Sequence, residues 1–274
     1  MYDYHVFQSG KMFIWNVKSD NEALKGSNSH CHKEYELLFF INGEAEYRIE
    51  GRVYHLVSDS LLLIPTNYYH QWLTPKEKTN HRIAIHFLPE MLNKAERGFF
   101  LDLFAEPLYF INSTQHDLNF YIKSITECEL MDTSLQEMAV KSRMIALLTQ
   151  IRYLRSTKAV KPVILDERIR NMLTYIGNNL DKDIYLDSLS EQFLITKNHL
   201  NFLFQKIVGT TIMKYITIKR LGIARQEIIE GARPTEAAYK AGFNDYTTFY
   251  RAYKSFYGSA PSELLTESTD SIKS

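Results

Sequence analysis

The order of apolar and polar residues in the first third of the chain has the period of β-strands. Apolar and polar residues alternate in EAEYRIE at 44–50, which is typical of a strand with one buried face. Turn residues such as Asn42-Gly43 separate stretches of this kind. Many short strands joined by close turns predict a closed antiparallel sandwich or barrel, which we place in residues 1–90.

The period then lengthens to that of amphipathic helices. Segments 117–130 and 133–156 repeat apolar residues every three or four positions. The second segment carries two apolar stripes, one formed by Met138, Ile145 and Leu148 and the other by Met144, Leu147, Ile151 and Leu154. A helix that is apolar on two sides covers its own barrel and also meets either a dimer partner or another helix of the chain. We expect residues 91–156 to be a dimerisation and coupling segment, followed by a linker at 157–165.

A repeat organises the remaining helical region. Two blocks match at a constant offset, the first at Leu200, Leu203, Phe204, Gly209 and Thr210 and the second at Phe249, Ala252, Tyr253, Gly258 and Ser259. Each block follows a helix-start residue, Thr196 or Asp245, and each is preceded by a short amphipathic helix and a tight turn. This arrangement predicts two helix-turn-helix units, although a plain helical bundle is the alternative.

The segment between the two units has the length of a spacer. A helix of about 21 residues spans ~31 Å, close to the ~34 Å of one turn of B-DNA. Such a helix could place two recognition helices in successive major grooves on one face of a duplex.

Composition narrows the class of protein. The chain is 45% hydrophobic and 23% charged, as in ordinary globular proteins, and no apolar run approaches the ~20 residues of a membrane span. The N-terminus lacks the basic start and apolar core of a signal peptide. Two distant cysteines, Cys31 and Cys128, favour reduced thiols over a disulfide framework. Residues 157–274 carry 16 Lys and Arg against 13 Asp and Glu, a small basic excess.

Two stretches of the helical region carry a family resemblance. GFNDYTTFYRAYKSFYGSAPSELL and YLDSLSEQFLITKNHLNFLFQKIVGTTIMKYITIKRLGIA resemble the C-terminal domain of the AraC/XylS family of bacterial transcriptional regulators. The resemblance covers residues 166–265 and implies a DNA-binding domain of seven helices whose third and sixth helices bind DNA. The sequence departs from the family where Thr196 replaces a common Ser, Ala237-Ala238 a common Ile-Ala, and Pro234 a common Ile.

The first part of the chain resembles the cupin-type barrel with which regulators of this family sense their effectors. HCHKEYELLFFING at 30–43 fits the first cupin motif, and SDSLLLIPTNYYH at 58–70 fits the second. The departures are Asp59 and Asn67, where cupins usually carry Gly, and the lack of an Asn at the usual distance after His70.

These motifs supply residues that can bind a metal. In an extended strand His30 and His32 point to one face while Cys31 points to the other. By the resemblance, His30, His32, Glu36 and His70 reproduce the ligand set with which cupin enzymes hold Mn, Fe, Ni or Zn. Three interpretations stay open: a divalent transition metal, direct contact with an effector, or a structural imidazole cluster.

The candidate effector site is wider than the motifs. An aromatic ring can stack on a sugar, and Arg can pair with hydroxyl or carboxylate groups. The expected effector-binding residues are therefore His30, His32, Glu36, His70, Trp72, Arg82 and His86.

The candidate DNA-binding residues are those left outward when the apolar stripes of the two recognition helices face inward. They are Lys197, Asn198, Asn201, Phe202 and Gln205 in the first helix, and Tyr246, Thr247, Thr248, Tyr250, Arg251 and Lys254 in the second. By the resemblance, Asn198, Asn201, Phe202, Thr247, Tyr250 and Arg251 fall on positions that reach bases. Phe202 either reads thymine methyl groups or packs inward. Lys206, Lys214, Lys219, Arg220 and Lys254 are candidate phosphate contacts.

The predicted fold class is α+β with two main domains: a cupin-like barrel with flanking helices, and an all-α domain of two helix-turn-helix units joined by a long helix at 166–265, with a flexible tail at 266–274. The predicted function is sequence-specific regulation of transcription, controlled by a small molecule such as a sugar. The alternative is a cupin metalloenzyme, an isomerase or oxygenase, fused to a DNA-binding domain. We find no phosphate loop, zinc motif or nucleophile triad, and we expect no catalysis. The expected partners are double-stranded DNA, an effector, a second copy of the chain and, for an activator, RNA polymerase, in the cytoplasm.

Overall fold

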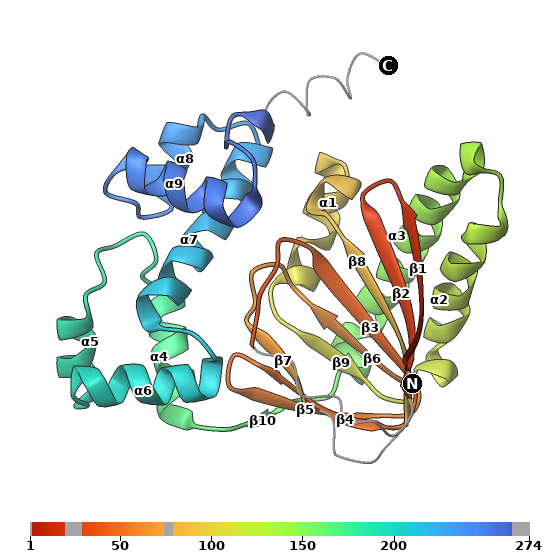
Figure 1. Ribbon diagram of the computed structural model, residues 1–274, viewed down its shortest axis with the longest axis horizontal. Helices are drawn as coiled ribbons and strands as arrows, with labels where there is room; N and C mark the ends of the chain where they lie inside the picture. The colour runs from red at the N-terminus through yellow and green to blue at the C-terminus, as the bar shows by residue number, and fades with distance from the viewer. Residues whose placement is uncertain (1, 20–28, 74–78, 265–274) are drawn as a thin grey trace. The chain divides into compact units, whose positions relative to one another are not determined.

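The protein divides into two compact units, residues 1–163 and 164–274, in a computed structural model that describes residues 2–19, 29–73 and 79–264 (Figure 1). The tail expected at 266–274 lies outside the described residues. The first unit is built on antiparallel sheets and the second is helical, which confirms the predicted α+β class.

Two sheets form the first unit. The larger has the order β1 (Tyr2–Ser9), β2 (Met12–Ser19), β8 (Asn80–Phe87), β3 (Tyr35–Asn42), β6 (Ser60–Ile64) and β9 (Leu108–Phe110). The smaller has the order β10 (Val163–Ile164), β5 (Arg52–Val57), β4 (Glu44–Ile49) and β7 (His70–Leu73). The pairings among β1 to β9 are antiparallel.

Strand β3 shows why its sequence reads as an unbroken apolar run. Leu37 and Phe39 belong to one buried cluster, while Leu38 and Phe40 belong to another. Both faces of the strand are therefore covered, and alternation is lost. Strand β4 has one covered face, and its burial alternates as the period of two predicts.

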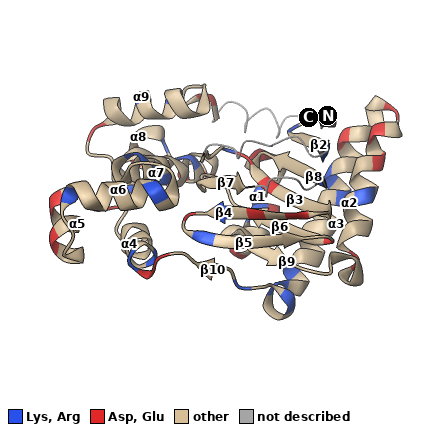
Figure 2. Ribbon diagram, turned by 60° about the horizontal axis from the view of Figure 1, so that its bottom comes forward, with Lys and Arg blue, Asp and Glu red and all other residues tan. Residues whose placement is uncertain are grey.

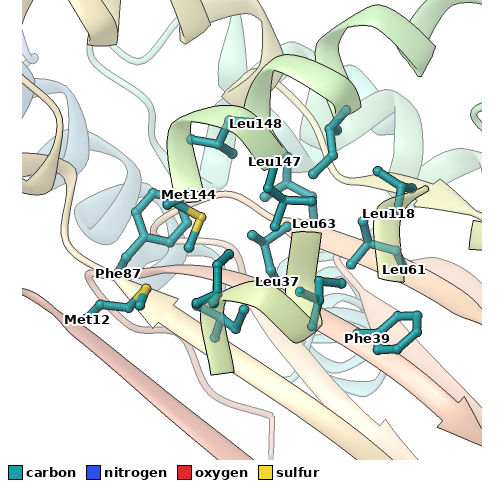
Figure 3. Close-up of a cluster of buried hydrophobic side chains, with 14 of the residues drawn as sticks. Met12, Leu37, Phe39, Leu61, Leu63, Phe87, Leu118, Met144, Leu147 and Leu148 are labelled. Atoms are coloured by element: carbon teal, nitrogen blue, oxygen red, sulfur yellow. The ribbon is translucent and has the colours of Figure 1, made fainter. Parts of the chain in front are cut away.

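Helices cover the outer face of the larger sheet. They are α1 (Lys94–Phe100), α2 (Leu118–Thr126) and α3 (Thr133–Lys158), with short 3-10 turns at Pro89–Met91, Leu101–Phe104, Ser113–His116 and Glu127–Leu130. Figure 3 shows Leu118 of α2 and Met144, Leu147 and Leu148 of α3 packed with sheet residues that include Leu37. The second cluster, which includes Leu38, Tyr47 and Trp72, fills the space between the inner faces of the two sheets.

Helix α3 corrects one detail of the sequence analysis. Its stripe of Met144, Leu147, Ile151 and Leu154 is buried as expected, but Leu148 is buried too and Ile145 is half-buried against the same core. The apolar side chains of α3 that remain exposed are Leu135, Met138 and Tyr153. Of the other predicted stripe, Met138 is exposed, whereas Ile145 and Leu148 pack into the core.

The second unit contains two helix-turn-helix units joined by a longer helix. Its helices are α4 (Glu167–Gly177), α5 (Leu186–Phe193), α6 (Lys197–Val208), α7 (Ile212–Ile229), α8 (Pro234–Lys240) and α9 (Tyr246–Tyr257). Helices α6 and α9 are the third and sixth of this unit, and α7 connects the pairs over 18 residues, fewer than the expected 21 or so. Of the seven helices that the resemblance implies, these six lie within the described residues.

Candidate functional site

Five residues of the first unit form what we call the imidazole–carboxylate cluster: His30, His32, Glu36, His70 and His86. Glu36 on β3 and His86 on β8 are direct cross-strand partners, and His30 pairs with His70 through an isolated bridge. Cross-strand partners have their side chains on the same face of a sheet. The register thus gathers residues that are up to 56 positions apart in sequence (86 − 30 = 56).

The carboxylate of Glu36 lies at the centre of the cluster. Its Oε2 atom is 3.3 Å from Nε2 of His32 and 3.4 Å from Nε2 of His70, and its Oε1 atom is 3.8 Å from Nε2 of His86. Tyr47 donates its hydroxyl proton to Oε1 at 3.3 Å. Glu36 and His70 are buried, while His32 and His86 are half-buried and His30 is exposed.

The surroundings set the protonation of these groups. Burial alone would raise the pKa of Glu36, but His86, His32 and His70 outweigh it and hold that pKa well below its usual value. Burial lowers the pKa of His70 to about 4. Burial would also lower the pKa of His32, yet its contacts with Glu36 and Glu34 raise it above the usual value. The cluster therefore holds a buried negative charge faced by imidazole rings.

A divalent transition metal fits these donors. Imidazole nitrogen and carboxylate oxygen are the ligands that such ions take in cupin-like sites. Two sets have ligand atoms within 4.8 Å of one another, His30 with His32 and His70, and His32 with Glu36 and His86. The residues from the motifs thus converge as expected, and His86 joins them.

Trp72 and Arg82 lie near the cluster but do not match the expected stacking role. The Arg82 guanidinium lies 4.5 Å from the centre of the Trp72 ring, which is only 8% exposed. Arg82 also donates a hydrogen bond to Oδ1 of Asn80 at 2.5 Å. The Trp72 face is therefore occupied by a side chain of the protein, and a sugar cannot stack there without displacing it.

Two residues that contact the imidazole–carboxylate cluster were missed in the sequence analysis. Trp15 of β2 is half-buried and makes an edge contact with His86, with ring centres 4.5 Å apart. Tyr47 of β4 contacts Glu36, and burial together with that charge raises its pKa well above the usual value. The alternation in MFIWNV marks Trp15 as opposite in face to Ile14, but only the pairing of β2 with β8 brings it to His86.

The expected DNA-binding residues of α6 lie mostly outward. Lys197, Asn198, Phe202 and Gln205 are exposed, and basic residues stand near both ends of the helix (Figure 2). Phe202 is 63% exposed, which decides against inward packing. The Lys197 ammonium forms an ion pair with Asp187 of α5.

The expected residues of α9 are also on its surface. Thr247, Thr248, Arg251 and Lys254 are exposed, and Tyr246 and Tyr250 are half-buried, while Phe249 and Tyr253 fill the core. Asp245 accepts hydrogen bonds from the N–H groups of Thr247 and Thr248 at 3.2 and 2.6 Å, as an N-cap does. A hydrogen bond from the Thr248 side chain, together with these two backbone hydrogen bonds, lowers the pKa of Asp245.

Two residues expected on DNA have structural partners instead. The Asn201 side-chain oxygen accepts a hydrogen bond from the Ile212 N–H at 3.2 Å, which competes with bidentate pairing to adenine. Arg220 donates to the carbonyls of Leu180 and Lys182 at 2.8 and 2.6 Å. Arg220 thus joins α7 to the loop before α5 and does not point a free guanidinium outward.

Comparison with known proteins places these two units in described families. Residues 19–171 match the model of the AraC-like ligand binding domain, more than half of the chain, and residues 189–267 match that of a helix-turn-helix domain. Among the helices of the described residues, none is long and apolar enough to cross a bilayer.

Relatives with curated names cover the whole chain or its helical part. The chain is 24% identical over 244 residues to the probable transcriptional regulator LumQ of Photobacterium leiognathi. That alignment covers 88% of this chain and 93% of LumQ. The chain is 31% identical over 100 residues to the transcriptional activator RhaS of Mannheimia succiniciproducens, 36% of this chain and 37% of that one. Among solved structures, ToxT from Vibrio cholerae aligns over 94% of this chain and 98% of its own, with 13% identity and a TM-score of 0.40.

Proposed function

The chain belongs to the AraC family of transcriptional regulators, and we propose that a small molecule bound beside the imidazole–carboxylate cluster controls how it binds DNA. Membership of the family makes it a DNA-binding regulator rather than an enzyme, so the metalloenzyme alternative is set aside. The observation that carries the proposal is the buried Glu36 surrounded by imidazoles. Burying polar groups costs free energy unless they make hydrogen bonds or ionic contacts, and a bound small molecule would supply such contacts.

The proposed effector is a small molecule rich in oxygen. Its hydroxyl or carboxylate groups would face Arg82 and the imidazoles, and its flat or apolar side would lie against Trp15 rather than Trp72. A sugar is one member of this class. The proposed contact set is Trp15, His30, His32, Glu36, His70, Arg82 and His86, and Trp72 lies behind Arg82.

The proposed DNA contacts divide by exposure. Asn198, Phe202, Thr247, Tyr250 and Arg251 are proposed to read bases, and Lys197, Gln205, Tyr246, Thr248 and Lys254 to contact the backbone or neighbouring groups. Asn201 is proposed to assist through its free amide protons only, because its oxygen serves Ile212.

The proposed assembly is a cytoplasmic homodimer that contacts RNA polymerase. The two copies would meet through the outward face of α3, where Leu135, Met138 and Tyr153 are 58%, 74% and 76% exposed. Their spacings of 3 and 15 residues keep them on one side of the helix. An effector would act by favouring one arrangement of the dimer, in proportion to its difference in affinity for the two arrangements.

The test uses the full-length protein. An operator is first found by selection from genomic fragments, and a panel of sugars and small acids is then screened by thermal shift. A compound that shifts the melting temperature should also change operator binding. His32→Gln combined with Glu36→Gln should abolish that shift and leave operator binding intact in the absence of compound.

A matched control tests the location of the site. His55 is an exposed histidine on β5, away from the cluster, and His55→Gln should retain the full thermal shift. Retention of the shift by the double variant would place the effector elsewhere, and no selected operator at all would contradict the DNA-binding assignment.

A further inference from the structure

The inner face of strand β8 carries polar side chains toward both of its ends. Successive side chains of a strand point to opposite faces, so one face of β8 is formed by Asn80, Arg82, Ala84 and His86. Ala84 belongs to the apolar cluster between the two sheets, and His86 is the cross-strand partner of Glu36. Asn80 and Arg82 therefore lie on the inner face as well, at the end of β8 away from the imidazole–carboxylate cluster.

Asn80 is a buried amide with an unused hydrogen-bond donor. The residue is 3% exposed, and its Oδ1 atom accepts a hydrogen bond from the Arg82 guanidinium at 2.5 Å. Because a guanidinium only donates, the amide must turn its oxygen toward Arg82, which fixes the place of Nδ2. Among the residues that the structure describes, none accepts a hydrogen bond from this Nδ2 atom. A buried donor of this kind costs free energy until an acceptor reaches it.

The turn between β3 and β4 packs directly on Asn80. A Cβ built on Gly43 would lie 3.1 Å from both Cα and Cβ of Asn80, and 2.6 Å from the carbonyl oxygen of Thr79. Gly43 also has φ +104°, which favours glycine. Asn80 is thus fixed on its backbone side by this turn and at its side-chain oxygen by Arg82, so the direction of its unused donor is set before any ligand binds.

Arg82 adds a positive charge at the same end of the strand. Its guanidinium lies 4.5 Å from the centre of the Trp72 ring, and the residue is half-buried, so part of it reaches solvent. Burial and the charge of Glu36 raise the pKa of Tyr47, and the charge of Arg82 acts in the opposite direction. Arg82 is therefore within electrostatic reach of the Tyr47 hydroxyl, which donates to Glu36. The inner face has a positive end at Arg82 and a negative end at Glu36.

We propose that the effector is a small hydroxy carboxylic acid whose carboxylate is held by the Arg82 guanidinium and the Nδ2 group of Asn80. The two oxygens of a carboxylate suit two neighbouring donors, of which the charged one makes the stronger hydrogen bond. The hydroxyl groups of the acid would donate to Glu36, whose ionised carboxylate only accepts. The inference rests on the proposed effector function and narrows it from oxygen-rich molecules to acids. A neutral sugar could accept a hydrogen bond from Asn80 but would gain less from the charge of Arg82.

The test compares acids with neutral molecules of the same carbon skeleton on the full-length protein. The pairs are D-glucuronate with D-glucose, D-galacturonate with D-galactose, and D-gluconate with D-sorbitol. Melting temperatures are measured with each compound, and dissociation constants are then measured by calorimetry. We expect at least one acid to raise the melting temperature and its neutral counterpart to bind more than about tenfold more weakly.

Two variants test the residues that hold the carboxylate. Asn80→Asp keeps the shape of the side chain and an acceptor for Arg82, but it replaces the donor with a negative charge, so binding of the acid should be lost. Arg82→Gln should weaken it by more than about tenfold. Arg48→Gln is the matched control, because Arg48 lies on the outer face of β4, paired with Glu46 at 2.6 Å, and its variant should bind the acid as the parent does. If Arg82→Gln does not fold, Asn80→Asp still decides.

The outcomes separate this inference from the proposal beneath it. Shifts by neutral members of the pairs alone, or equal affinity for an acid and its neutral counterpart, would overturn the acid and leave the effector proposal standing. Unchanged binding of the acid by Asn80→Asp, or equal loss in Arg48→Gln, would overturn the assignment of the carboxylate to Asn80 and Arg82. The absence of a shift with these pairs and with the wider panel of sugars and acids would instead count against the effector proposal itself.

Discussion

The two helix-turn-helix units share a plan but are held in place differently. Helix α9 begins at Asp245, which caps two N–H groups, whereas Thr196 at the start of α6 makes no side-chain cap. The turn before α9 has a glycine in the left-handed region, Gly242 at φ +90°, whereas the turn before α6 uses Leu194 at φ +55°. The second helix-turn-helix pair, α8 and α9, therefore has residues that suit its cap and turn conformations, and the first pair, α5 and α6, does not.

The turn before α9 also contacts residues outside the α8–α9 pair. Asn244 donates to Asp183 at 2.6 Å, and Arg220 of α7 donates to the carbonyls of Leu180 and Lys182. Gly242 packs on this same loop, because a Cβ built there would lie 2.0 Å from the Leu180 carbonyl oxygen. The loop between α4 and α5 and the turn before α9 thus form one joint, and the relative position of α6 and α9 depends on it.

The largest effect is expected from Gly242→Ala. The new methyl group would collide with backbone, and alanine resists positive φ, so the joint must open at a cost of more than about 3 kcal/mol. The variant should melt at a much lower temperature and lose operator binding. Gly231→Ala is the control, since it too has positive φ but no atom lies within 4 Å of its added Cβ. Equal losses in both variants would show that backbone conformation, rather than the joint, is responsible.

Arg220→Ala tests the joint from the side of α7. Two carbonyls would lose their donor, which should lower the free energy of unfolding by about 1–3 kcal/mol. Lys206→Ala, at an exposed position of α6, should leave the melting temperature unchanged and weaken DNA binding at low salt only. If Arg220→Ala instead weakened DNA binding with no change in melting temperature, Arg220 would be a phosphate contact after all.

The two recognition helices can be compared through Arg251 and Phe202. Arg251→Ala should weaken binding to the selected operator by ~1–3 kcal/mol and relax preference at one base position. Phe202→Ala should cost about 1 kcal/mol, because it removes only an apolar contact with a thymine methyl group. Both side chains are exposed, so the melting temperatures should not change. Equal weakening on operator and random DNA would make either residue a backbone contact.

The DNA-binding unit was predictable because its signals are local. Caps, glycines and apolar stripes lie within a few residues of the features that they determine, and α6 and α9 begin where Thr196 and Asp245 indicate. The orientation of Arg220 was not predictable, since its partners are about 40 residues away. A basic residue on an amphipathic helix looks the same in sequence whether it contacts DNA or a carbonyl.

In the barrel, more of the site depends on contacts between residues that are distant in sequence. The motif residues His32, Glu36 and His70 converge as predicted, because motif spacing and strand period together constrain them. The contacts of His86 and Trp15 depend on which strands pair and in what register, and a shift of one residue would turn either side chain to the other face. Side-chain contacts such as Arg82 on Trp72 depend on packing and carry no signal in the sequence.

The smallest effect, and the only stabilising one, is expected from Leu194→Gly. Leu194 is 92% exposed, so its side chain contributes almost no buried area, and its positive φ costs a residue with a Cβ about 1 kcal/mol or more. Glycine removes that strain but gains freedom in the unfolded chain, which leaves a net gain of about 0.5–1 kcal/mol. Leu194→Ala keeps the Cβ and the strain, so its melting temperature should equal that of the parent. A gain in both variants would trace the effect to the exposed leucine side chain, and a gain in neither would show that the first turn is as well adapted to its conformation as the second.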